Sequence, residues 1–210
     1  RFLQLCAGEN IQVVNCTTPS NYFHVLRRQM HREFRKPLVV MTPKSLLRHK
    51  RCISNISEFI SKSSFHRVLE DDSYAEENKL IKLKKDKYIK KVVICSGKIY
   101  YDLIEAREKS KNNEVVFIRL EQLYPFPAKT LANVLKRYKK AKFIWCQEEP
   151  KNMGAWNTVR NYIDRTLEII NLKDINVKYV GRKASSSTAT GNANKHLAEQ
   201  KEILEKILKN

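Results

Sequence analysis

The sequence predicts an α/β fold in which a parallel sheet carries helices on both of its faces. From residue 92 onward, short runs of branched and aromatic residues alternate strictly with longer segments of helical period. The runs at 92–95 and 143–146 are apolar throughout, which is typical of strands that are buried on both faces. Polar turns follow the runs directly, at the edge where parallel strands present their carboxyl ends.

The first fifty residues predict a strand, a helix and a second strand. An apolar run at 11–16 is followed by a helical stripe over 20–34 and by a further apolar run at 37–41. Hydroxyl side chains around Pro19 supply the N-cap of the helix: Thr17, Thr18 and Ser20. Because apolar residues with helical spacing already begin at Phe2, we expect the end of an α/β unit, and in the whole chain a C-terminal fragment of a longer protein.

Residues 42–91 lack a clear period and are rich in serine, lysine and acidic side chains. They predict a long connection with one short helix near 53–61, and an exposed, mobile stretch over 71–86 where acidic and basic runs alternate. The length of this connection indicates a domain boundary. We therefore expect one unit at 1–50, a linker at 51–90 and a second unit at 91–210.

The second unit is expected to contain strand and helix pairs in alternation. Its strands are predicted at 92–95, 115–120, 143–146 and 177–181. Its helices are predicted at 98–109, 128–138, 155–169 and 194–209. A loop rich in serine and threonine separates the last strand from the last helix.

Two of the strand-to-helix turns carry groups suited to an anion. Ser96, Gly97 and Lys98 follow the first strand of the second unit, where backbone amides and a lysine can hold an anion. A simple N-cap by Ser96 is the interpretation that we prefer for this turn. After the next strand, two prolines fix the turn and place Lys129 in the first turn of a helix. A cation is unfavourable there unless an anion lies opposite, so this turn indicates a phosphate-bearing ligand.

The run FIWCQEEPKNMGAW, at 143–156, leads from a strand into two adjacent carboxylates. Glu148 and Glu149 have the composition of a general acid and base pair, because neighbouring carboxylates split their pKa values. They also precede a helix start, where negative charge is stabilised by about 0.3 to 1 kcal/mol without any catalysis. We expect a structural or interface role for both residues.

The chain is strongly basic, with a formal net charge of +19 and a pI near 9.8. Such a field attracts phosphate backbones, which makes a basic nucleic-acid-binding module an alternative class of function. The basic residues are scattered over solvent faces or concentrated at 79–91, and they are not interleaved with exposed aromatic residues as a stacking surface requires. Nucleic-acid binding is therefore the weaker interpretation.

Cysteine and histidine patterns predict neither a disulfide framework nor a metal site. The five cysteines are odd in number, widely spaced and outside any CxxC motif, so we expect reduced thiols. A catalytic thiol at Cys146 is an alternative that lacks a neighbouring histidine in the sequence. The five histidines show no metal-ligand spacing. We find no P-loop, no GxGxxG motif, no signal-peptide pattern and no apolar run long enough to span a membrane.

Four motifs follow one another along the chain: KPLVVMTPKSLLRH at 36–49, VVICSGKIYYDL at 92–103, RLEQLYPFP at 119–127 and WCQEEPKNMGAW at 145–156. Together they resemble the C-terminal part of the 2-oxoglutarate dehydrogenase family, and the resemblance covers the whole chain. It implies that residues 1–50 end a transketolase-like pyrimidine-binding domain. It also implies that residues from about 90 onward form a transketolase-like C-terminal domain.

The resemblance implies an enzyme that decarboxylates 2-oxoglutarate on thiamine diphosphate and passes the succinyl group to a lipoyl group. It further implies magnesium beside the cofactor, a homodimer, and a complex with a dihydrolipoyl succinyltransferase and a dihydrolipoyl dehydrogenase. In the family, the cofactor ligands and catalytic histidines lie upstream of the matched part. We therefore expect no catalytic, cofactor-binding or metal-binding residue in this chain, which alone would be inert and would serve dimer and domain interfaces.

Some members of the family carry a nucleotide or acyl-CoA effector pocket between these two domains. The resemblance implies that three of its positions match here: Arg28, Gln122 and Lys129. It agrees with the unfavourable position of the Lys129 cation in the first turn of a helix, which by itself indicates an anionic ligand. At four other positions the side chain differs from that of acyl-CoA-regulated relatives: Gln12, Ser64, Arg67 and Thr130. The sequence predicts an anionic effector site and leaves its ligand open.

Two alternatives lie within the family: a paralogue acting on 2-oxoadipate and a non-oxidative 2-oxoglutarate decarboxylase. An interaction module, which makes the dimer and docks neighbouring proteins, is a different class of function that suits the chain taken alone. No membrane association is expected. Reduced cysteines suit both the bacterial cytoplasm and the mitochondrial matrix.

Overall fold

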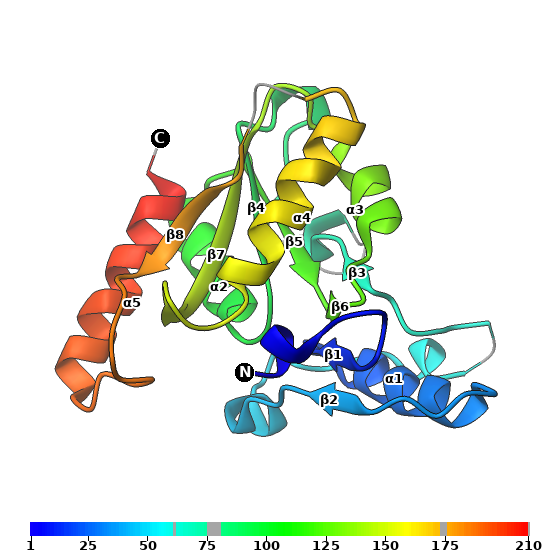
Figure 1. Cartoon of the computed structure of the whole chain (residues 1–210). Helices are drawn as coiled ribbons and strands as arrows, with labels where there is room; N and C mark the ends of the chain where they lie inside the picture. Colours follow the sequence, from blue (N-terminus) through cyan, green and yellow to red (C-terminus); the bar gives the residue numbers. More distant parts are fainter. Residues whose placement is uncertain (61, 75–80, 173–175, 210) are drawn as a thin grey trace.

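Two sheets organise the chain in the computed structural model, which describes residues 1–60, 62–74, 81–172 and 176–209 (Figure 1). The strands are β1 (Gln12–Val14), β2 (Leu38–Val40), β3 (Val68–Leu69), β4 (Lys91–Cys95), β5 (Val115–Leu120), β6 (Gln122–Tyr124), β7 (Lys142–Pro150) and β8 (Lys178–Arg182). The α-helices are α1 (Pro19–His31), α2 (Ile99–Ser110), α3 (Ala128–Leu135), α4 (Trp156–Ile169) and α5 (Ala193–Leu208). Short 3-10 helices are η1 (Phe2–Leu5), η2 (Lys44–Arg48), η3 (Ile56–Glu58), η4 (Asp72–Tyr74) and η6 (Asp86–Tyr88).

The larger sheet has five strands in the order β3-β5-β4-β7-β8. Strands β5, β4, β7 and β8 are parallel, as the alternating strand and helix pattern predicts. β3 joins the edge of the sheet antiparallel to β5. In register, Val93 of β4 lies between Phe117 of β5 and Ile144 of β7. These side chains are buried because helices cover both faces of the sheet.

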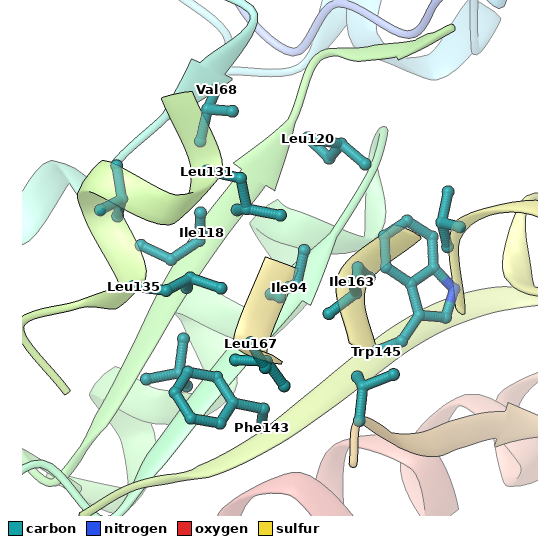
Figure 2. Packing of buried hydrophobic residues seen from close by; sticks show 14 of the residues in the cluster. Val68, Ile94, Ile118, Leu120, Leu131, Leu135, Phe143, Trp145, Ile163 and Leu167 are labelled. Atoms are coloured by element: carbon teal, nitrogen blue, oxygen red, sulfur yellow. The ribbon is translucent and has the colours of Figure 1, made fainter. Parts of the chain in front are cut away.

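Alternate side chains of the strands point to opposite faces of the sheet and belong to two separate apolar clusters. On one face, Ile94 and Ile118 pack beneath α3 and α4, which contribute Leu131 and Ile163 (Figure 2). On the other face, strand residues such as Val93 join a second cluster with α2 and α5. The prediction of an α/β fold with helices on both faces is confirmed.

The smaller sheet has three strands in the order β2-β1-β6. β1 pairs with β2 in parallel and with β6 antiparallel, and α1 packs beside it. The N-cap of α1 is Thr18, whose hydroxyl accepts a hydrogen bond from the amide of Asn21, with Pro19 at the first helical position. Only Glu121 separates β5 from β6, so one continuous segment runs from the five-stranded sheet into the three-stranded sheet.

Residues 51–90, expected to be a linker, contain β3 and several short helical turns. The helix expected at 53–61 is reduced to the single turn of η3, and residue 61 lies outside the described residues. The expected exposure of 71–86 is wrong for Asp71, which is 3% exposed. Its carboxylate accepts hydrogen bonds from Arg107 and from the amide of Phe117, and the buried ion pair fixes this part of the segment. Residues 75–80 of that stretch lie outside the described residues.

Candidate anion-binding site at the junction of the two units

Arginine side chains gather where α1 faces the segment that leads into β3. Arg28 lies in the last turn of α1 and Arg32 is the C-cap residue that follows it, and both donate to the Oε1 atom of Gln12, at 3.0 and 2.6 Å. Arg67, just before β3, lies near enough to Arg28 and Arg32 to repel both charges. We call Gln12, Arg28, Arg32 and Arg67 the arginine cluster. Arg28 and Arg32 share a neutral amide oxygen as acceptor, and no carboxylate forms an ion pair with any of the three arginines within the described residues.

The arginine cluster separates two hollows. The first, of about 400 Å³, is lined by residues that include Arg28, Ser64, Arg67 and Thr130. The second, of about 370 Å³, is lined by Gln12, Arg32, Arg67 and Gln122, with Glu9 at its wall. Arg67 lines both hollows, which therefore form adjoining parts of one basic surface.

Burial and mutual repulsion make the cluster electrostatically strained. Burial lowers the pKa of Arg28 to about 10, and the charges of Arg32 and Arg67 add to this effect. Burial and Arg67 likewise lower the pKa of Arg32, while Glu9 partly opposes the change. The guanidinium of Arg28 also stacks over the ring of Phe65, with 4.2 Å from its carbon to the ring centroid. A bound anion would relieve the repulsion among these arginines.

The residues expected in an effector site lie around this surface but not in one hollow. Arg28 lines the first hollow and Gln122 the second. Gln122 donates its amide to the carbonyl of Pro125 at 2.7 Å, and its buried Oε1 has no hydrogen-bond partner within the described part of the chain. Lys129 is exposed in the first turn of α3, beside Thr130, which lines the first hollow.

The arginine cluster itself was not identified from the sequence as one site. Arg28 and Arg32 are four residues apart, a spacing that brings like charges together along or just past a helix, and this spacing is the signal that the sequence offers. Gln12 and Arg67 were noted only as departures from relatives. Their meeting depends on the pairing of β1 with β6 and on the path into β3, and neither was predictable from local patterns.

A buried polar network joins the two units beside the arginine cluster. Glu121 is fully buried between β5 and β6. Its carboxylate accepts hydrogen bonds from the amide of Thr17 at 2.9 Å, the hydroxyl of Thr17 at 2.6 Å and the side-chain amide of Asn21 at 2.8 Å. Arg119, also buried, donates to the Thr17 hydroxyl and pairs with Asp72. The Glu121 carboxylate is fully engaged by these protein donors, so the network has a structural role.

The FIWCQEEPKNMGAW turn is organised by Gln147, not by its carboxylates. Gln147 is 2% exposed, and its Oε1 accepts from the indole of Trp145 at 2.9 Å and from the amide of Trp156 at 3.0 Å. Its Nε2 donates to the carbonyl of Met153 at 2.8 Å. Glu148 forms an ion pair with Lys98 at 2.7 Å, and Glu149 is exposed. The strand extends to Pro150, so both glutamates lie within β7 and not at a helix start.

The turn before α2 differs from its predicted form. Lys98 occupies the N-cap position without a side-chain hydrogen bond, so the expected capping by Ser96 is wrong. The Ser96 hydroxyl is buried and has no partner among the described residues. Gly97 has φ +76°, and a β-carbon there would approach the side-chain nitrogen of Asn15 to 2.5 Å. The left-handed backbone and the contact with Asn15, the residue after β1, both favour glycine at this position.

All five cysteines are free thiols. Cys146 is buried inside the sheet, and burial raises its pKa well above the ordinary value, which is the opposite of an activated nucleophile. Within the described ranges, no group of three or more histidine, cysteine, aspartate or glutamate side chains is arranged to hold a metal ion. In the same part of the chain, no helix combines the length and apolar character needed to cross a membrane.

Comparison with known proteins identifies the family. Residues 53–208 match the model described as 2-oxoglutarate dehydrogenase C-terminal, and residues 1–50 match the model described as transketolase, pyrimidine binding domain. Curated proteins named 2-oxoglutarate dehydrogenase E1 component, from Brucella abortus (strain S19) and Brucella ovis, are each 57% identical over 208 residues. That alignment covers 99% of this chain and 21% of each relative, so the chain spans about a fifth of their length. The chain belongs to the 2-oxoglutarate dehydrogenase C-terminal family, here joined to the end of a transketolase-type pyrimidine-binding domain.

Proposed function

We propose that this chain is part of a 2-oxoglutarate dehydrogenase component, which decarboxylates 2-oxoglutarate and transfers the succinyl group to a lipoyl group. The observation that carries the proposal is the 57% identity to E1 components over nearly the whole chain, with both family models matched in order. The chain alone then serves domain and dimer interfaces. We also propose the domain assignment 1–50, 51–90 and 91–210, in which the middle segment connects the two units.

Thiamine diphosphate with magnesium is the cofactor proposed for the full-length enzyme, where it supplies the electron sink for decarboxylation. The described residues do not fit the role of its ligands. The buried carboxylates of Asp71 and Glu121 are occupied by protein hydrogen-bond donors. The residues that hold the cofactor are therefore assigned to the remainder of the full-length protein, and no reaction step is assigned to this chain.

The proposed partners are a second copy of the enzyme, a dihydrolipoyl succinyltransferase and a dihydrolipoyl dehydrogenase. The matched relatives are E1 components, a name that denotes one member of a multi-component assembly. Because the organisms named for these relatives are bacteria, we propose the bacterial cytoplasm in preference to the mitochondrial matrix.

The substrate assignment is tested with the full-length enzyme loaded with thiamine diphosphate and magnesium. With an artificial electron acceptor, kcat/KM for 2-oxoglutarate is expected to exceed that for 2-oxoadipate by about tenfold or more, the discrimination that one methylene provides. A preference for 2-oxoadipate would identify the paralogue. Carbon dioxide release without succinyl transfer to lipoyl groups would identify the non-oxidative decarboxylase.

We further propose that the arginine cluster, with Gln122 and Lys129, binds an anionic effector such as a nucleotide or an acyl-CoA. The support is physical: Arg28 and Arg32 share one neutral acceptor with Arg67 close by, and Arg28 is kept charged at neutral pH although burial and repulsion disfavour that charge. The unpartnered Oε1 of Gln122 supplies an acceptor for a ligand hydroxyl or amino group. Lys129, exposed beside the first hollow, supplies a further cation.

Titration of the full-length enzyme with AMP and with acetyl-CoA tests this site. Arg28→Ala is expected to raise the half-maximal effector concentration about tenfold or more, because a charge-assisted hydrogen bond contributes about 1.5–3 kcal/mol. Arg48→Ala, at an exposed arginine outside both hollows, is the matched control and should respond like the wild type. Kinetics that neither compound alters, in any of the three proteins, would remove the effector site.

A further inference from the structure

The amino ends of the parallel strands form a second basic surface. Backbone hydrogen bonds bring three segments together there: Lys90 donates its amide to the carbonyl of Glu114, and Lys142 donates to the carbonyl of Lys90, both at 2.8 Å. The amide of Lys84 donates to the carbonyl of Asn113 at 3.0 Å. We call the exposed lysines of this surface the lysine edge: Lys84, Lys85, Lys87, Lys90, Lys140 and Lys142.

The lysine edge is unbalanced in charge. Glu114 pairs with Lys84 and Lys90, both at 2.6 Å, and these hydrogen bonds lower its pKa. The remaining members, Lys85, Lys87, Lys140 and Lys142, have no ion-pair partner among the residues that the structure describes. A positive electrostatic potential therefore remains at this end of the sheet.

Ion pairs with Glu114 use the charges of Lys84 and Lys90, but no ion pair within the described residues uses those of Lys85, Lys87, Lys140 and Lys142. Lys91, behind the edge, has a structural role because its ammonium donates to the carbonyls of Ile207 and Lys209 at the end of α5. Burial, together with the charge of Lys142, lowers the pKa of Lys91, so Lys142 disfavours the charge on this structural group. Like charges held close together without an internal benefit are typical of a surface that attracts an oppositely charged partner.

The chemistry of the lysine edge favours a protein partner over a nucleic acid. Its cations are lysines, and the neighbouring Arg137 is engaged by Glu70 and Asp86. Nucleic acids favour arginine forks and stacked aromatic residues, whereas the one aromatic ring at this edge is Tyr88, 55% exposed, within the described residues. The hollow at the strand ends is only about 170 Å³, too small to follow a phosphate backbone.

We propose that the lysine edge docks the acidic face of a folded protein domain that carries the acyl acceptor. The inference rests on the proposed function, in which an acyl carrier must arrive and leave in every turnover. Hydrated lysine charges suit such repeated, fast encounters, because they raise the association rate more than the affinity. β5 and β7 run toward the N-terminal unit in Figure 1, so the lysine edge lies at the far end of the sheet from the arginine cluster.

The test uses the full-length enzyme, its isolated lipoyl-bearing carrier domain and the double variant Lys87→Glu/Lys140→Glu. At about 20 mM salt, kcat/KM for succinyl transfer to the carrier is expected to fall about tenfold or more, and at about 300 mM salt the variant and the wild type should converge. Turnover of 2-oxoglutarate with an artificial acceptor should be unchanged. Lys44→Glu/Lys50→Glu carries the same charge change on exposed lysines elsewhere and should leave both rates unaltered.

A neutral version, Lys87→Gln/Lys140→Gln, should show a smaller loss with the same dependence on salt. Carrier kinetics that are identical in the wild type and the charge-reversed variant at every salt concentration would overturn the inference. Retardation of RNA or DNA by the wild type that the variant loses would also overturn it, in favour of a nucleic-acid surface. If no protein turns over 2-oxoglutarate with the artificial acceptor, the proposed function fails as well.

Discussion

At the scale of single residues, Glu121 shows how one carboxylate holds two units together. It lies between β5 and β6, and its hydrogen bonds reach Thr17 and Asn21 of the N-terminal unit. Burial raises its pKa, and this effect outweighs the opposing influence of Arg119 and of the hydrogen-bond donors. The folded state therefore resists ionisation of this carboxyl more than the unfolded chain does.

The raised pKa of Glu121 makes the stability of the folded wild type fall as pH rises. As pH rises above about 4.5, the unfolded chain releases the Glu121 proton before the folded state does, so wild-type stability falls until the folded pKa is passed. Glu121→Gln keeps an acceptor for Thr17 and Asn21 but cannot ionise. As pH rises through this range, the free energy of unfolding of Glu121→Gln should therefore increase relative to that of the wild type. Urea denaturation between pH 4 and 7 measures the difference.

Glu105→Gln is the control for this measurement. Hydrogen bonding to Lys109 lowers the pKa of Glu105, so its contribution to stability has the opposite sign and is lost as pH falls. The side chain is 54% exposed, and the effect should be small. A wild-type profile that rises relative to Glu121→Gln would contradict the raised pKa of Glu121.

Sequence patterns located several of these residues without giving their roles. The sequence identifies the FIWCQEEPKNMGAW segment and predicts a structural or interface role for Glu148 and Glu149, but it does not single out Gln147. Gln147 holds this turn together through its hydrogen bonds. Its neutral amide gives no distinctive pattern in the local sequence, and one of its partners, Trp156, lies nine residues along the chain. Buried hydrogen-bond networks depend on three-dimensional positions that periodicity does not encode.

At the scale of elements, the turn from β7 to α4 is closed by a glycine in the left-handed region. Gly154 has φ +65°, and a β-carbon there would approach the amide group of Gln147 and the β-carbon of Glu149 to 2.9–3.0 Å. Gly154→Ala should lower the free energy of unfolding by about 1–3 kcal/mol, since left-handed backbone and crowding both oppose the methyl group. Thermal or urea denaturation of the purified variant measures the loss.

Gly191→Ala provides the matched comparison for this variant. Gly191 has a similar φ of +68°, but an added β-carbon would meet nothing within 4 Å, so only the backbone penalty applies. Gly154→Ala should therefore be the more destabilised of the two. Equal losses would show that contact with Gln147 contributes nothing.

Elements were predictable where local sequence determines them. β4 and β5 are mostly apolar runs, and their positions match the sequence prediction to within a residue. β3 and β6 were not predicted, because each has only two or three residues and owes its existence to a partner far along the chain. β7 is longer than its apolar run because an irregular pairing with β8 carries it on to Pro150.

At the scale of the whole molecule, the two sheets should unfold together. Both tryptophans, Trp145 and Trp156, lie in the larger unit, so fluorescence reports on that unit while far-ultraviolet circular dichroism reports on all helices and strands. Because β6 and the Glu121 network connect the units, we expect coincident midpoints from the two signals. Midpoints that differ beyond experimental error would show that the units unfold independently.

The strand β6 also constrains how this protein can change over evolutionary time. The sequence from the larger unit supplies Tyr124 and Gln122 as partners for Val13 and Val14 of β1. A recombination event in the intervening segment would place β1 from one parent beside β6 from another. Substitutions on β1 must therefore remain compatible with those on β6.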